Sequence, residues 1–133
     1  MQDRPTPAEL VEAVAAFLRE QVMPATTATL AFHARVAANA LDIARREIAL
    51  APAAQQREHA ALVALLGSDP GSDVAQLNQL LCERIASGAI GLETPGLADC
   101  LWQITLDKLA VDQPTYDTYV RSLHSKAADE KDR

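Results

Sequence analysis

The chain has 133 residues, of which 49% are apolar, 23% charged and 4% aromatic, and its net charge is −6. This length fits one domain with a mainly aliphatic core. The negative net charge argues against nucleic acid or an anionic membrane surface as a partner, because proteins bind both through basic residues. No stretch approaches the roughly 20 apolar residues that span a bilayer. Two cysteines are too few for a disulfide framework. We therefore expect a cytoplasmic protein.

The first predicted helix begins at Pro7. The segment Thr6-Pro7-Ala8-Glu9 combines the capping-box spacing with proline at the first helical position. Pro24 is expected to end this helix, because proline has no N–H to donate and its ring clashes with the preceding turn. A second helix is predicted over residues 30–50, ending before Pro52. Its apolar residues cover about half of the cylinder, which indicates more than one neighbouring element.

Four further helices are predicted, over residues 53–66, 74–87, 95–111 and 114–125. A clear loop, residues 67–73, separates the first two of these. Asp73 and Gln76 repeat the capping-box pattern, and Thr94-Pro95 is expected to start the helix over residues 95–111. That helix is apolar nearly all round, which is typical of a central, buried helix.

The fold predicted from these elements is all-α. We expect a compact, bundle-like array of five to six helices without a sheet, because the apolar residues recur at helical spacing and no segment alternates like a strand. The array is expected to form a single domain over residues 1–125. Residues 126–133 lack large apolar side chains and are predicted to be a flexible C-terminal tail.

His33 lies near the centre of the apolar arc of the helix over residues 30–50. It is either a general base or metal ligand, or a core histidine with one hydrogen bond. The second interpretation is favoured because no other ligand lies three or four residues away. The remaining histidines and cysteines do not have a metal-binding spacing either: His59, Cys82, Cys100 and His124. No dinucleotide, phosphate-loop or nucleophile motif is present, so we expect no metal, no cofactor and no catalytic residue.

Four polar residues follow one edge of the same helix: Arg35, Asn39, Asp42 and Arg46. Three interpretations remain open. Guanidinium groups could bind a carboxylate or phosphate. The residues could form surface pairs along the helix, each of small energetic value. They could also form a buried polar seam that fixes a neighbouring helix or subunit. Together with His33, these four residues are the candidate binding or interface positions.

Three segments resemble a small, uncharacterised, all-helical bacterial family that carries a domain of unknown function. They are the opening residues 2–6 (QDRPT), residues 30–41 (LAFHARVAANAL) and residues 108–116 (KLAVDQPTY), and the resemblance extends over residues 2–123. Residues 32–39 are its most specific part. Members of that family tend to be encoded beside aminoglycoside-phosphotransferase-like kinases and acyl-CoA dehydrogenases. The resemblance therefore implies a place near acyl-CoA metabolism and supplies no catalytic residues.

We expect a non-enzymatic helical accessory protein, a partner of such a kinase. The alternative is a binder of an acyl or phosphorylated small molecule held between the helices over residues 30–50 and 95–111, with His33, Arg35 and Arg46 as polar contacts. An enzyme is disfavoured because His33 and Glu47, the titratable pair on the apolar arc, are about 21 Å apart along the helix. The wide apolar arc also predicts self-association as a homodimer.

Overall fold

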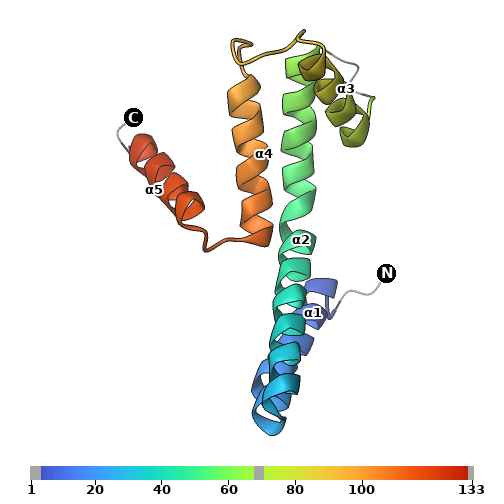
Figure 1. The fold of residues 1–133 in the computed structure, drawn as a ribbon, viewed down its shortest axis with the longest axis vertical. Coiled ribbons are helices and arrows are strands. Elements are labelled where there is room, and N and C mark those ends of the chain that lie inside the picture. Colours follow the sequence, from blue (N-terminus) through green and yellow to red (C-terminus); the bar gives the residue numbers. More distant parts are fainter. Residues whose placement is uncertain (1–3, 68–70, 132–133) are drawn as a thin grey trace. The chain divides into compact units, whose positions relative to one another are not determined.

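The computed structural model describes residues 4–67 and 71–131, with side chains described as far as residue 125 (Figure 1). Within these residues the chain forms five α-helices and no strand. They are α1 (Pro7–Phe17), α2 (Ala28–Leu66), α3 (Val74–Ala86), α4 (Leu97–Asp112) and α5 (Asp117–Lys131). The predicted all-α fold is therefore confirmed. Residues 68–70 of the predicted loop lie outside the described part of the chain.

The start of α1 follows the predicted capping box. The Thr6 hydroxyl accepts a hydrogen bond from the Glu9 N–H at 3.3 Å, and the Glu9 carboxylate accepts one from the Thr6 N–H at 2.7 Å. The two N–H donors have no partner within the helix, so this exchange satisfies both. After Phe17 the chain passes through a π-helical turn, Leu18–Val22, and a 3-10 turn, Met23–Ala25, which contains Pro24.

The predicted end of the second helix before Pro52 is wrong. Pro52 lies inside α2, and the helix predicted over residues 53–66 is the second half of the same element. Proline removes one N–H donor and crowds the carbonyl of Ile48, four residues earlier. Four alanines, which have the highest intrinsic helix propensity, surround it at positions 49, 51, 53 and 54. The helical preference of these neighbours outweighs the local penalty of one proline.

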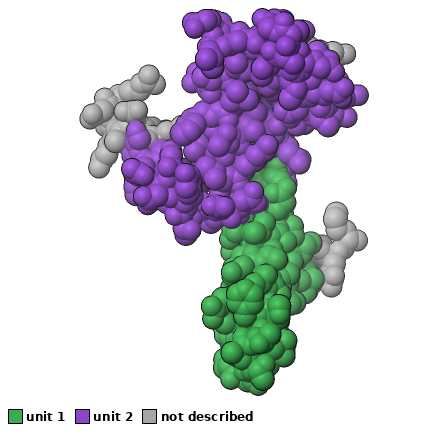
Figure 2. Space-filling model, viewed as in Figure 1, with its two compact units in different colours: residues 1–51 green, residues 52–133 purple. Residues whose placement is uncertain are grey.

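The chain divides into two compact units, residues 1–51 and residues 52–133 (Figure 2). The boundary falls at Pro52, where α2 lacks a backbone hydrogen bond. Within the described part of unit 2, seven buried side chains form one cluster: Leu62, Leu66, Leu77, Leu81, Ile90, Leu97 and Cys100. They come from the end of α2, from α3, from the α3–α4 connection and from α4. Unit 2 therefore has a hydrophobic core of its own.

Unit 1 is a helical hairpin of α1, its two following turns and the first part of α2, and we call it the N-terminal hairpin. Among its described residues, 4–51, the buried side chains are three alanines, Ala15, Ala34 and Ala38. Alanine allows two helices to approach closely, but it removes little apolar surface from water. The larger apolar side chains of the hairpin are partly or mostly exposed.

The helix over residues 95–111 was predicted to start at Thr94-Pro95, and this is wrong. α4 begins at Leu97 after Gly96, whose φ of 84° lies in the left-handed region that favours glycine. The Thr94 hydroxyl instead accepts a hydrogen bond from the Gly91 N–H at 3.1 Å. α4 is also less buried than its apolar composition predicts, since Trp102 is 50% exposed.

The helix α3 begins where it was expected, whereas α5 runs from Asp117 to Lys131 in place of the expected residues 114–125. Asp73 caps α3 and exchanges hydrogen bonds with Gln76 as predicted, at 2.8 and 3.1 Å. The backbone of α5 is helical as far as Lys131, so helix extends into the range for which a flexible tail was expected.

Candidate functional site

All five candidate residues lie on α2 within the N-terminal hairpin. Arg35, Asn39, Asp42 and Arg46 are spaced four, three and four residues apart, which places them within about 60° of the helix circumference. We call this row the polar edge. Arg35 and Asn39 are exposed, whereas Asp42 and Arg46 are half-buried. The polar edge is therefore a partly solvated surface feature.

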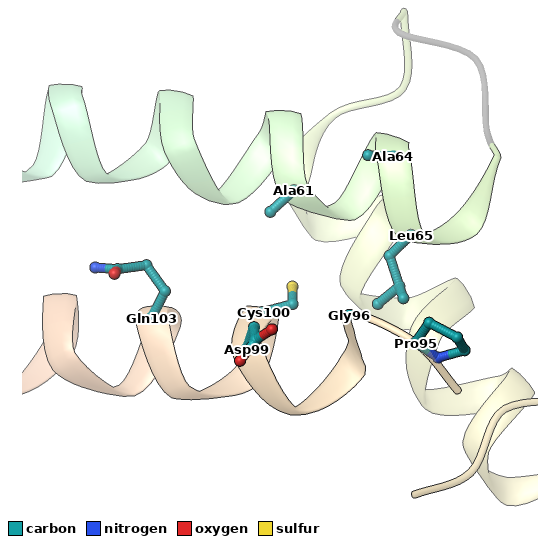
Figure 3. A pocket seen from close by; sticks show the side chains of 8 residues that line it. All are labelled: Ala61, Ala64, Leu65, Pro95, Gly96, Asp99, Cys100 and Gln103. Carbon is teal, nitrogen blue, oxygen red and sulfur yellow. The ribbon is translucent and has the colours of Figure 1, made fainter. Parts of the chain in front are cut away.

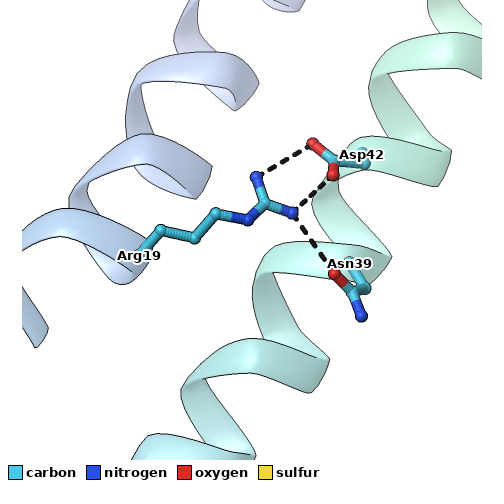
Figure 4. Close-up of polar contacts among 3 residues, drawn as sticks. All are labelled: Arg19, Asn39 and Asp42. Atoms are coloured by element: carbon cyan, nitrogen blue, oxygen red, sulfur yellow. Dashed lines mark hydrogen bonds and ion pairs between the residues drawn. The ribbon is translucent and has the colours of Figure 1, made fainter. Parts of the chain in front are cut away.

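Two members of the polar edge bind an arginine that the sequence did not single out (Figure 4). Arg19, in the π-helical turn after α1, places Nη1 at 3.4 Å from Asp42 Oδ1 and Nη2 at 2.5 Å from Asp42 Oδ2. Arg19 Nη2 also donates to Asn39 Oδ1 at 3.2 Å. This forked contact ties the two helices of the hairpin together. Asn39 and Asp42 therefore contact a neighbouring helix, as a seam would, but the contact is partly exposed and not buried.

The charges of this contact are mutually stabilised. The hydrogen bonds from Arg19 hold the pKa of Asp42 below its usual range, and the nearby charges of Arg46 and Arg45 act in the same direction. The pKa of Arg19 is raised in turn, chiefly by its hydrogen bonds to Asp42. Sequence reasoning missed Arg19 because no local pattern connects residues 23 positions apart. The available signal was a single arginine among the glutamates of residues 9–20.

His33 is exposed, so the interpretation as a core histidine is wrong. Its ring lies edge-on to Phe32, with the centroids 5.7 Å apart and the planes inclined by 69°. Phe32 is itself 58% exposed. Among the residues that the structure describes, no three histidine, cysteine, aspartate or glutamate side chains are grouped as metal ligands. His33 therefore belongs to the solvent-facing surface of the hairpin.

A row of large apolar side chains borders the polar edge. We call this row the α2 stripe, and it consists of Phe32, Val36, Ile43 and Leu50. At 100° per residue these positions fall within about 40° of one another. Each side chain is between 38% and 58% exposed. An exposed apolar row with a polar border is the usual composition of a protein-docking surface.

A family model described as "Domain of unknown function (DUF6285)" matches residues 24–116, more than half of the chain. The chain belongs to this family. The match contains the α2 stripe, the polar edge and most of unit 2, while α1 and Arg19 precede it. No curated protein and no solved structure matches the chain. Across residues 4–67 and 71–131, no helix combines the length and apolar character needed to cross a bilayer.

Unit 2 of this DUF6285 chain contains a groove between the end of α2 and the start of α4, with a volume of about 410 Å³ (Figure 3). Its lining is mostly apolar and comprises Ala61, Ala64, Leu65, Pro95, Gly96, Asp99, Cys100 and Gln103. Burial raises the pKa of the Cys100 thiol, and the nearby charge of Glu58 acts in the same direction, so this thiol is a weak nucleophile. None of the five candidate residues lines this groove.

Proposed function

We propose that this chain is a non-enzymatic helical interaction protein that docks on a protein partner through the α2 stripe. The observation that carries the proposal is the row of four large apolar side chains, 38–58% exposed, along one side of a single helix. Helices that dock into grooves of other proteins present apolar anchors along one side, and the four-residue and seven-residue steps of the stripe are among the spacings they use. The stripe supplies the apolar centre, and the polar edge supplies a rim.

The rim indicates which surface the partner presents. Arg35 is exposed beside the stripe, and Arg46 is half-buried on the same edge. The exposed Arg35 fits a carboxylate of the partner on this side of the stripe, while the exposed Glu47 borders the stripe on its other side. The family resemblance points to a phosphotransferase-like kinase acting near acyl-CoA metabolism, and we propose that kinase as the partner.

Binding of the full chain to a purified kinase of this class, encoded near its own gene, tests the proposal. The informative variant is Val36→Glu with Ile43→Glu, because both side chains already contact solvent and their replacement leaves the buried alanines in place. We expect this variant to lose affinity by roughly 30-fold or more, the effect of removing hot-spot residues. A matched control is Leu92→Glu in unit 2, since Leu92 is 92% exposed.

Two results would contradict the docking proposal. The first is no binding of the wild-type chain at high micromolar concentration. The second is equal affinity of the stripe variant and the Leu92→Glu control. If instead the stripe variant alone loses binding, the anchors are those named here.

A second candidate function is small-molecule binding in the groove of unit 2. The groove has the volume of a typical ligand site, but its lining contains no arginine or histidine. An acyl chain therefore fits it better than a phosphorylated group. Titration with a fluorescent fatty acid should saturate, and Ala64→Trp should abolish the signal by filling the groove. Equal binding by wild type and Ala64→Trp would remove this candidate.

A further inference from the structure

The N-terminal hairpin lacks a hydrophobic core. Among its described residues, 4–51, nothing larger than alanine is buried, whereas the described part of unit 2 buries six leucines. A unit of this size is at the lower limit for independent folding and normally needs further apolar burial from another chain or element. The contact between Arg19 and Asp42 is partly exposed and does not replace such burial. Another layer of apolar side chains is therefore needed on the hairpin.

One face of the hairpin offers the surface for that layer. We call it the hairpin face, and it consists of Leu10, Val14 and Phe17 on α1 with Leu30, Leu41 and Ile48 on α2. On each helix these positions are about 100° or more around from the residues of the Arg19–Asp42 contact, so they lie on the opposite side of the hairpin. On α2 they are also more than about 120° from the α2 stripe. The hairpin face and the stripe are separate surfaces.

We infer that the hairpin face is covered by the same face of a second copy of the chain. Leu10, Val14 and Phe17 are 49%, 50% and 57% exposed, and Leu30 and Ile48 are 52% and 43% exposed. At roughly 100 Å² each, these side chains and Leu41 account for most of the ~800 Å² per partner that a stable interface buries. The closed assembly has four helices, two from each copy, in two layers.

Two features favour a second copy over an unrelated occupant. On α2 the large residues of the hairpin face are bordered by Ala37 and Ala44 on the side away from α1, and by the half-buried Arg45 on the side that packs on α1. A two-fold axis brings each face against itself, and the exposed large residues of the face are apolar on both helices, so each copy presents the kind of surface that the other needs to cover. A layer that the hairpin needs in order to fold must be available wherever the chain is made, and a second copy is always made with it, although its concentration sets how much dimer forms.

The inference is independent of the proposed function, because the α2 stripe stays outside the dimer interface. Sedimentation velocity of the full chain should give twice the chain mass of 14.3 kDa at micromolar concentration. Val14→Glu with Phe17→Glu should give the monomer mass. The matched control, Val36→Glu with Ile43→Glu, introduces the same two charges on the stripe and should remain dimeric.

The same variants separate failure of the dimer from failure of partner docking. If the dimer and the docking proposal both hold, the Val14→Glu, Phe17→Glu chain still binds the kinase through its stripe. If the wild-type chain is dimeric but binds no kinase, the docking proposal alone fails. If that variant loses helical content, the wild-type chain decides: its melting temperature should rise with protein concentration, as for any fold coupled to association. A wild-type chain that is monomeric at about 100 μM overturns the inference. The inference is also overturned if the Val14→Glu, Phe17→Glu chain remains dimeric while the Val36→Glu, Ile43→Glu chain becomes monomeric.

Discussion

Substitution of Leu62 by alanine tests whether unit 2 has the core described here. Leu62 is 0% exposed and belongs to the cluster that joins α2, α3 and α4. Removing a fully buried leucine side chain from a close-packed cluster leaves a cavity that neighbouring helices close only in part. We therefore expect the free energy of unfolding of unit 2 to fall by about 3–5 kcal/mol. A loss of this size is a large fraction of the stability of a small domain.

Trp102 provides the assay, because it is the single tryptophan of the chain and lies on α4 in unit 2. Its fluorescence during urea denaturation reports unit 2, while far-UV circular dichroism reports the helices of both units. The control is Leu92→Ala, which should change the free energy of unfolding by less than about 0.5 kcal/mol because Leu92 is 92% exposed. The reasoning is refuted if Leu62→Ala shifts the fluorescence midpoint no more than Leu92→Ala does.

Three further predictions concern individual residues. Because the pKa of Asp42 is lowered in the folded chain, its carboxylate contributes stability above the unfolded pKa of about 3.9, and this stability is lost as the pH falls through the lower folded pKa. The difference in urea midpoint between wild type and Asp42→Asn should therefore shrink in acid. A difference that stays constant with pH would contradict this. Exposed Cys82 should be alkylated at pH 8 well before buried Cys100, whose pKa is raised, and mass spectrometry of the two peptides checks the order. Asp73→Ala should lower the free energy of unfolding of unit 2 by about 1 kcal/mol, measured by Trp102 fluorescence, because the cap of α3 is lost; no change would show that the cap is dispensable.

Local sequence signals predicted the parts of the fold that depend on local chemistry. The capping boxes at Thr6 and Asp73 mark the first residues of α1 and α3, because the side chain and the N–H groups that it satisfies are three residues apart. Pro52 shows the limit of such signals. A proline is a strong stop in isolation, but its effect depends on the helix propensity of the residues around it, and α2 continues through it.

The candidate site was predicted in part. Helical spacing placed Arg35, Asn39, Asp42 and Arg46 on one edge of α2, and the structure agrees. The contact of Arg19 with Asp42 and Asn39 depends on how α1 packs on α2, which no pattern within either helix specifies. His33 was misplaced for a related reason. Apolar periodicity shows which face of a helix avoids water, but it cannot show whether the covering surface belongs to the same chain.

Amide hydrogen exchange in residues 7–51 tests the central claim most directly, namely that the exposed apolar surfaces of the N-terminal hairpin are interfaces. Exchange would be followed at about 1 μM and about 100 μM protein, and then with the kinase added. We expect amide protection in the hairpin to be higher at about 100 μM than at about 1 μM protein. Adding the kinase should raise the protection of α2 in the hairpin further. The core residues of unit 2 should be equally protected under all three conditions. Hairpin protection that equals that of unit 2 at every concentration, with and without the kinase, would contradict it.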